Sequence, residues 1–158
     1  MIVWQLKYNC MKISKKYPFV YETPMRWGEM DALGHLNNTI YFRYSEEARI
    51  QLFNESAINV RLEDPVGPIL AFIDCQFLLP VIYPDRLIFG TWIQKIGITS
   101  MHVYHDIYSE EHNRIVAQMK SVIVMITYET GEKVTISDEL RRAIEARQAD
   151  FDLGAIDR

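Results

Sequence analysis

Cysteine is scarce in this sequence, which has only Cys10 and Cys75 among its 158 residues. Two widely separated thiols cannot build a disulfide framework, and they are too few for a thiolate metal site. Such sparse use of cysteine is typical of a reducing compartment, so we expect a cytoplasmic protein.

Long apolar runs are also missing. No stretch approaches the roughly 20 apolar residues that a helix needs to span a bilayer. The short apolar start MIVW is followed by lysines instead of being preceded by them, which is the reverse of a secretory signal. We therefore expect neither export nor a membrane partner.

An excess of positive charge is absent too. The sequence has 17 Lys and Arg against 21 Asp and Glu, which gives a net charge of -4. A protein that binds nucleic acid usually shows a basic footprint for the phosphates, so nucleic acid is not an expected partner. With 49% hydrophobic and 24% charged residues, the composition is that of one compact domain with a substantial core.

The first predicted elements are a strand and a helix. Alternating side chains predict a strand from Phe19 to Gly28. Pro24 cannot donate a hydrogen bond to a neighbouring strand, which places this strand at a sheet edge or at a bulge. Apolar residues spaced three and four apart then predict a helix from Thr39 to about Ser56. Its expected inner face comprises Tyr41, Tyr44, Ala48 and Leu52.

The second half of the chain reads as strands. A loop without regular structure is expected from Asn59 to Pro68. Four strands follow at residues 69–79, 86–96, 98–109 and 114–129, and we expect them to be antiparallel neighbours because short turns join them. Ser137 is expected to cap a closing helix.

This order of elements predicts an α+β fold. A five-stranded antiparallel sheet must cover one apolar face, and the helix from Thr39 is the only predicted element long enough to do so. A curved sheet wrapped around one long central helix satisfies this requirement.

The loop EMDALGHLNN, residues 29–38, concentrates polar groups between the first strand and the long helix. Turn formation alone explains Gly34 and the two asparagines, and Asn37 or Asn38 is a good N-cap. Asp31 faces the helix start, where free backbone amides lie at the positive end of the helix dipole. A carboxylate opposite such amides suits acyl transfer, because the amides can stabilise an oxyanion.

The run DALGHLNNTIYFRYSEEAR, preceded by Trp27, Gly28 and Glu29, resembles the signature of the hotdog-fold thioesterases. The similar branch includes 4-hydroxybenzoyl-CoA thioesterase and related short acyl-CoA hydrolases. The resemblance implies that Asp31 is the catalytic carboxylate and that a backbone amide near Asn38 binds the thioester carbonyl. It also implies a homodimer or a homotetramer with sites at subunit boundaries.

Other residues of this run are candidates for a supporting role. We expect His35, Asn37, Asn38 and Tyr41 to contact the substrate, while Glu47 is a possible second carboxylate. Glu46 and Arg49 are spaced for a surface ion pair on the helix. No third ligand with persuasive spacing accompanies Asp31 and His35, so neither a metal nor another cofactor is expected.

The expected activity is therefore acyl-CoA thioester hydrolysis, with Asp31 acting as base or as nucleophile. One alternative is a thioesterase for acyl carrier protein, although the net charge of -4 disfavours an acidic partner. A second alternative is an acyl-thioester binding or scaffold protein without catalysis, since a fold does not fix its chemistry.

The first 16 residues are expected to be an N-terminal extension to a hotdog domain at residues 17–158. The stretch MKISKKYPFVYETPM reads like a natural start, so translation from Met11 is an alternative to an added segment.

Overall fold

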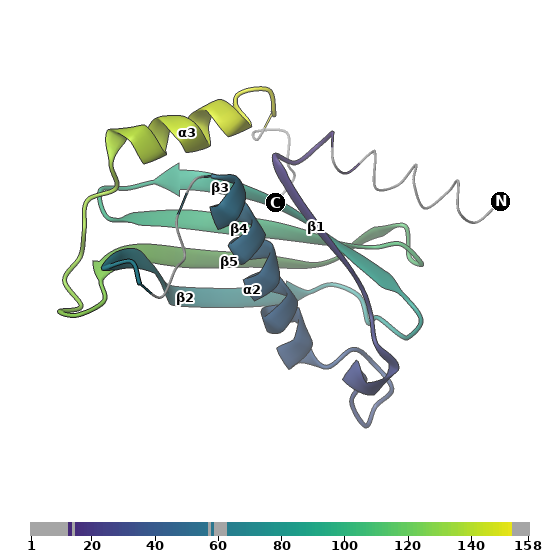
Figure 1. Cartoon of the computed structure of the whole chain (residues 1–158). Helices are drawn as coiled ribbons and strands as arrows, with labels where there is room; N and C mark the ends of the chain where they lie inside the picture. Colours follow the sequence, from purple (N-terminus) through teal and green to yellow (C-terminus); the bar gives the residue numbers. More distant parts are fainter. Residues whose placement is uncertain (1–12, 14, 57, 59–62, 153–158) are drawn as a thin grey trace.

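The structure is a computed structural model that describes residues 13, 15–56, 58 and 63–152. The first twelve residues, and with them the alternative start at Met11, lie outside the described residues. Figure 1 shows a single antiparallel sheet with one long helix lying across it. The elements are β1 (Phe19–Pro24), the 3-10 helix η1 (Trp27–Glu29), α2 (Asn38–Glu55), β2 (Val66–Phe77), β3 (Arg86–Ile96), β4 (Ser100–Ser109), β5 (Arg114–Thr127) and α3 (Asp138–Gln148).

The predicted α+β arrangement of five antiparallel strands and one long helix is confirmed. The strands lie in the order β1-β3-β4-β5-β2, so β1 and β2 form the two edges. Pro24 therefore lies in an edge strand, as its missing N–H group requires.

The predicted face of α2 packs on the sheet. Tyr41, Tyr44, Ala48 and Leu52 are all buried. The first half of the helix joins a core with side chains of β3, β4 and β5, and the second half joins a core that α3 closes with Ile144. Burying both ends of one helix fixes the position of its N-terminus relative to the sheet.

Two boundaries differ clearly from the sequence-based expectations. The first strand ends at Pro24 instead of Gly28, because Trp27–Glu29 turns into a 3-10 helix. The expected loop to Pro68 is too long, because β2 already begins at Val66 and pairs with β5. Trp27, which lies in this 3-10 helix and not in the strand, is 71% exposed.

The expected pairing of β2 with β3 is wrong. β2 pairs with β5 at one edge, whereas β3 pairs with β1 and β4. The segment between Leu78 and Asp85 is a crossing connection and not a hairpin turn. It lines the candidate site described below.

Two further features concern the cap of α3 and the second face of the sheet. Ser137 caps α3 as predicted, its hydroxyl accepting a hydrogen bond from the Leu140 amide at 3.1 Å. Ile13 and Tyr17 pack on the sheet face opposite α2, against Ile88 and Trp92. Within the described residues, no helix is long and apolar enough to cross a membrane.

Candidate functional site

The loop between η1 and α2 is a closed turn that presents Asp31. The Asp31 amide donates to the His35 carbonyl at 2.8 Å, and the Gly34 amide donates to the Asp31 carbonyl at 3.0 Å. Gly34 has a φ of +79°, a left-handed conformation that glycine adopts without a steric penalty. These bonds place Asp31 and His35 side by side, where the chain enters and leaves the turn.

Only one oxygen of the Asp31 carboxylate is used by this turn. Oδ1 accepts from the Leu33 amide at 2.8 Å and from the His35 amide at 3.4 Å. No residue of the described part of the chain bonds to Oδ2. Turn formation thus accounts for one oxygen and leaves the other available for chemistry.

The start of α2 offers one free backbone donor. Asn37 is the N-cap, and its Oδ1 accepts from the Thr39 amide at 2.9 Å. The Ile40 amide donates to the Asn37 carbonyl at 3.0 Å. The Asn38 amide finds no acceptor among the described residues, and it lies at the positive end of the helix dipole.

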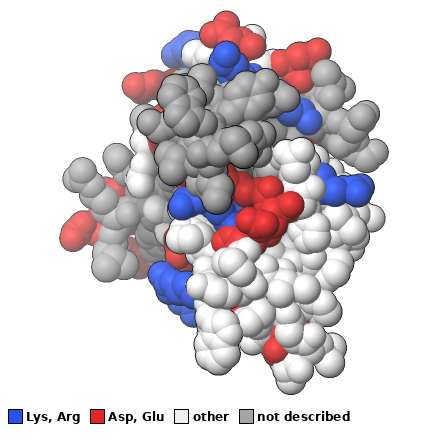
Figure 2. Space-filling view, turned by 90° about the vertical axis from the view of Figure 1, so that its right-hand side faces the viewer, with Lys and Arg blue, Asp and Glu red and all other residues white. Residues whose placement is uncertain are grey.

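Asp31 and the helix start line one pocket of about 390 Å³. The other lining residues are His35, Leu36, Asn38, Tyr41 and the segment 77–81. Two other pockets are somewhat larger, at about 450 and 430 Å³, and the second also brings a carboxylate with an oxygen unpartnered among the described residues, Asp64, to a helix start, that of α3. The Asp31 pocket differs from it in lying at the polar loop of residues 29–38. Figure 2 views the side that lies at the right in Figure 1, where a broad uncharged area borders a group of acidic side chains.

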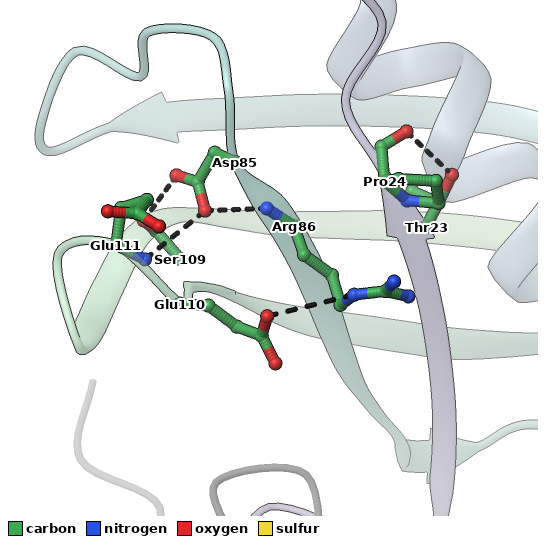
Figure 3. A network of polar contacts seen from close by, with 7 residues as sticks. All are labelled: Thr23, Pro24, Asp85, Arg86, Ser109, Glu110 and Glu111. Atoms are coloured by element: carbon green, nitrogen blue, oxygen red, sulfur yellow. Dashed lines mark hydrogen bonds and ion pairs between the residues drawn. The ribbon is translucent and has the colours of Figure 1, made fainter. Parts of the chain in front are cut away.

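The Asp85 carboxylate fixes the far end of the connection whose first residues line this pocket (Figure 3). Asp85 Oδ1 accepts from the Arg86 amide at 2.7 Å and from the Glu111 amide at 3.3 Å, and Oδ2 accepts from the Ser109 hydroxyl at 2.5 Å. Earlier in the same connection, the Val81 carbonyl accepts a hydrogen bond from the Leu36 amide at 2.8 Å. Asp85 therefore ties the end of this connection, four residues after Val81, to the turn between β4 and β5.

Glu29 holds the loop to the body of α2. Its carboxylate accepts hydrogen bonds from the Arg26 amide at 2.6 Å and from the Tyr44 hydroxyl. Its carbonyl accepts from the Asn37 amide at 2.9 Å. Glu29 thus joins the start of η1 to the last residue before α2 and to Tyr44 within α2. We call Glu29 and Tyr44 the loop clamp.

The structure brings four of the six predicted site residues together: Asp31, His35, Asn38 and Tyr41. Asn37 lies next to them as the N-cap and does not line the pocket. Glu47 is outside it, exposed, with its carboxylate accepting from the Tyr21 hydroxyl. Within the described residues, no group of three or more His, Cys, Asp or Glu side chains could hold a metal ion.

Sequence reasoning missed the loop clamp and Asp85, because contacts between distant segments create their roles. It also misjudged Arg49. This side chain is only 6% exposed, and its Nη1 donates to the Ser45 hydroxyl at 2.9 Å. The expected surface ion pair with Glu46 is therefore wrong, because position 49 lies on the flank of the helix that faces the sheet.

Arg49 borders a second buried polar group, His105 on β4. The Nδ1 atom of His105 lies 2.7 Å from the Thr91 hydroxyl, while Nε2 has no partner among the described residues. Burial, and secondarily the Arg49 charge, lowers the pKa of His105 from 6.5 to about 3. The imidazole is therefore a neutral core group and does not line the Asp31 pocket.

Comparison with known proteins finds similar chains of the same fold. The PA2801 protein of Pseudomonas aeruginosa, a proposed thioesterase, is 27% identical with a TM-score of 0.74, over 82% of this chain and 99% of that one. A thioesterase of Thermus thermophilus solved with coenzyme A and zinc is 24% identical with a TM-score of 0.72, over 84% and 96%. The uncharacterised protein YsmA of Bacillus subtilis (strain 168) is 25% identical over 129 residues, which are 81% of this chain and 86% of YsmA.

The solved structures confirm the predicted hotdog fold. Residues 25–144, which include the Asp31 loop, all of α2 and the four strands after it, match the thioesterase-like superfamily. The match covers most of the chain and contains every residue that lines the pocket. The chain belongs to the thioesterase-like superfamily.

Proposed function

We propose that this protein hydrolyses the thioester of an acyl-CoA to a free acid and coenzyme A. One observation carries the proposal: the free Oδ2 of Asp31 and the free amide of Asn38 line the same pocket. Family membership and the named thioesterases among the solved relatives support the reaction class. The Thermus thermophilus relative solved with coenzyme A supports the choice of carrier.

The two groups have complementary roles in this reaction. The thioester carbonyl oxygen accepts from the Asn38 amide, which stabilises the negative charge that develops when the carbonyl carbon is attacked. Asp31 either attacks that carbon or takes a proton from an attacking water molecule. In both routes the C–S bond breaks, water supplies the new hydroxyl group of the acid, and the thiolate of coenzyme A takes up a proton.

Neighbouring residues position this chemistry. His35 lines the pocket beside Asp31 and contacts the substrate in this proposal. Asn37 has an indirect role in this proposal. As the N-cap it fixes the first turn of α2 and leaves the Asn38 amide free. This proposal gives Glu47 no role in the reaction, because its carboxylate accepts a hydrogen bond from Tyr21 and does not line the pocket.

We further propose that the active form is a homodimer joined through β2. This edge strand exposes four large apolar side chains, Ile69, Leu70, Phe72 and Phe77. Phe77 and Leu78, which line the pocket, are 47% and 43% exposed. A second copy paired along β2 covers these side chains and encloses the pocket.

The experiment is hydrolysis of an acyl-CoA panel followed by release of free thiol, with Asp31→Asn beside the wild type. Loss of a catalytic carboxylate lowers kcat by about a hundredfold or more. Asp138→Asn is the matched control, because Asp138 is exposed in the first turn of α3, outside the pocket and away from β2. Unchanged turnover in Asp31→Asn contradicts the mechanism.

The same panel separates the alternatives. Thioesters carried on acyl carrier protein form its second arm, and faster turnover there than with coenzyme A identifies the carrier protein as the partner. Tight binding of acyl-CoA without turnover in the wild type indicates a scaffold protein instead.

A further inference from the structure

Tyr41 carries a hydroxyl group that the described part of the chain leaves without a partner. The residue is only 3% exposed, lies one turn after Asn38 on α2 and lines the Asp31 pocket. No residue of the described chain forms a hydrogen bond with its hydroxyl. Buried tyrosine hydroxyls usually find a partner, so this one is available to a ligand in the pocket.

The groups around this hydroxyl explain why it remains free. Burial, and then the nearby Cys75 and Asp85, raise the pKa of Tyr41, so its proton stays on. Asp85 is close enough to contribute, but its carboxylate already accepts from the Arg86 and Glu111 amides and from the Ser109 hydroxyl. It does not accept from Tyr41.

The second neighbour cannot satisfy the hydroxyl either. Burial raises the pKa of the Cys75 thiol to about 12, which keeps it neutral. A neutral thiol is a weak acceptor. The ring of Tyr41 is fixed by Phe77, which meets it edge-on with 5.2 Å between ring centroids. The hydroxyl is thus protonated, and the ring that carries it is fixed beside the pocket.

Charge in the pocket limits what this donor can meet. The described lining residues include the Asp31 carboxylate and no lysine or arginine. Asp85 adds a second carboxylate behind Tyr41. An acyl group with its own carboxylate meets repulsion here, whereas an uncharged hydroxyl or keto oxygen accepts the hydrogen bond without it.

We propose that Tyr41 is a specificity-determining residue that donates a hydrogen bond to an uncharged oxygen on the acyl chain. The preferred substrates are then hydroxyacyl or ketoacyl thioesters rather than plain alkyl or dicarboxylic ones. This inference rests on the thioesterase function proposed above. A plain alkyl chain buries the Tyr41 hydroxyl without a partner, and a site built to pair with oxygen discriminates against such an analogue.

The test compares kcat/KM for hexanoyl-CoA, for derivatives with one hydroxyl at successive carbons, and for adipoyl-CoA, which ends in a carboxylate. In the wild type we expect at least one hydroxylated derivative to exceed hexanoyl-CoA by about tenfold or more, with adipoyl-CoA the poorest. In Tyr41→Phe the ratio of kcat/KM for the hydroxylated derivative to kcat/KM for hexanoyl-CoA falls toward unity. Circular dichroism and Tm establish that the variant is folded.

Tyr108→Phe is the matched control. The Tyr108 hydroxyl donates to Asn113 on the sheet face opposite α2, outside the pocket. Its removal deletes the same group and leaves the substrate ratio unchanged.

Two results overturn the inference. One is a wild-type enzyme that shows no preference among the uncharged substrates. The other is a Tyr41→Phe variant that loses activity equally on all of them, which places the hydroxyl at the thioester carbonyl instead. Binding of non-hydrolysable thioether analogues, measured by calorimetry, gives the same comparison without turnover, so an inactive protein tests the inference independently of the proposed function.

Discussion

Tyr44 shows how a single hydroxyl can set the geometry of a distant carboxylate. It is buried on α2 and donates to Glu29, two residues before Asp31. Tyr44→Phe removes this bond, so we expect the loop to lose its fixed orientation against the helix. Misplacing a reacting group reduces turnover more than binding. We predict a fall in kcat of about tenfold or more with little change in KM, measured by steady-state hydrolysis.

Tyr21→Phe is the control for this prediction. It removes a similar bond from a tyrosine to a glutamate, since the Tyr21 hydroxyl donates to Glu47, outside the pocket. Its kcat should match that of the wild type. Equal losses in both variants show that Tyr44 has only a general structural role.

His105 gives a prediction about stability and pH. Its pKa is lowered to about 3 in the folded chain from 6.5. The unfolded chain therefore takes up a proton near pH 6.5, while the folded chain does so only near pH 3. The stability contribution of the neutral imidazole is present above pH 6.5 and falls as the pH drops through this window, by up to about 1.4 kcal/mol per pH unit.

His105→Gln removes the titrating imidazole. It should reduce the slope of the free energy of unfolding against pH, measured by urea denaturation between pH 7 and pH 5. His102→Gln is the control, because His102 is partly exposed on the opposite face of β4. A His105→Gln slope equal to that of the wild type contradicts the assignment.

At the scale of elements, two helix caps with similar bonds differ in what depends on them. Asn37 caps α2 and Ser137 caps α3. Replacing either with alanine should lower the free energy of unfolding by about 1 kcal/mol. Only Asn37→Ala should also lower kcat, because it loosens the turn that contains the Asn38 amide. Chemical denaturation and steady-state kinetics of the two variants test this, and equal kcat values count against a role for the helix start.

Elements with a strong local signal could be predicted from the sequence. The period of three and four in α2 and the caps at Asn37 and Ser137 depend on neighbouring residues, and the structure confirms them. The partner of β2 depends on how the crossing connection passes over the sheet, which alternation does not encode. The Asp31 loop could be recognised by its residues, whereas the loop clamp and Asp85 join segments far apart in the chain.

At the scale of the whole molecule, one chain leaves its pocket open on the β2 side. Phe77 and Leu78 line the pocket and remain exposed, and β2 has a free edge. A long apolar edge strand has unpaired backbone N–H and C=O groups, which favour pairing with another strand. The proposed dimer therefore links assembly to activity, because enclosure of the pocket requires the second copy.

Leu70→Lys tests this link. Leu70 is 41% exposed on β2, and a lysine there places two like charges close together when two copies pair along this edge. Ile98→Lys is the control, since Ile98 is 74% exposed between β3 and β4, away from the β2 edge. We predict that Leu70→Lys sediments as a monomer in analytical ultracentrifugation and loses turnover, while Ile98→Lys remains a dimer with wild-type activity. A monomeric Leu70→Lys variant with full activity separates the site from the assembly and contradicts enclosure by a second copy.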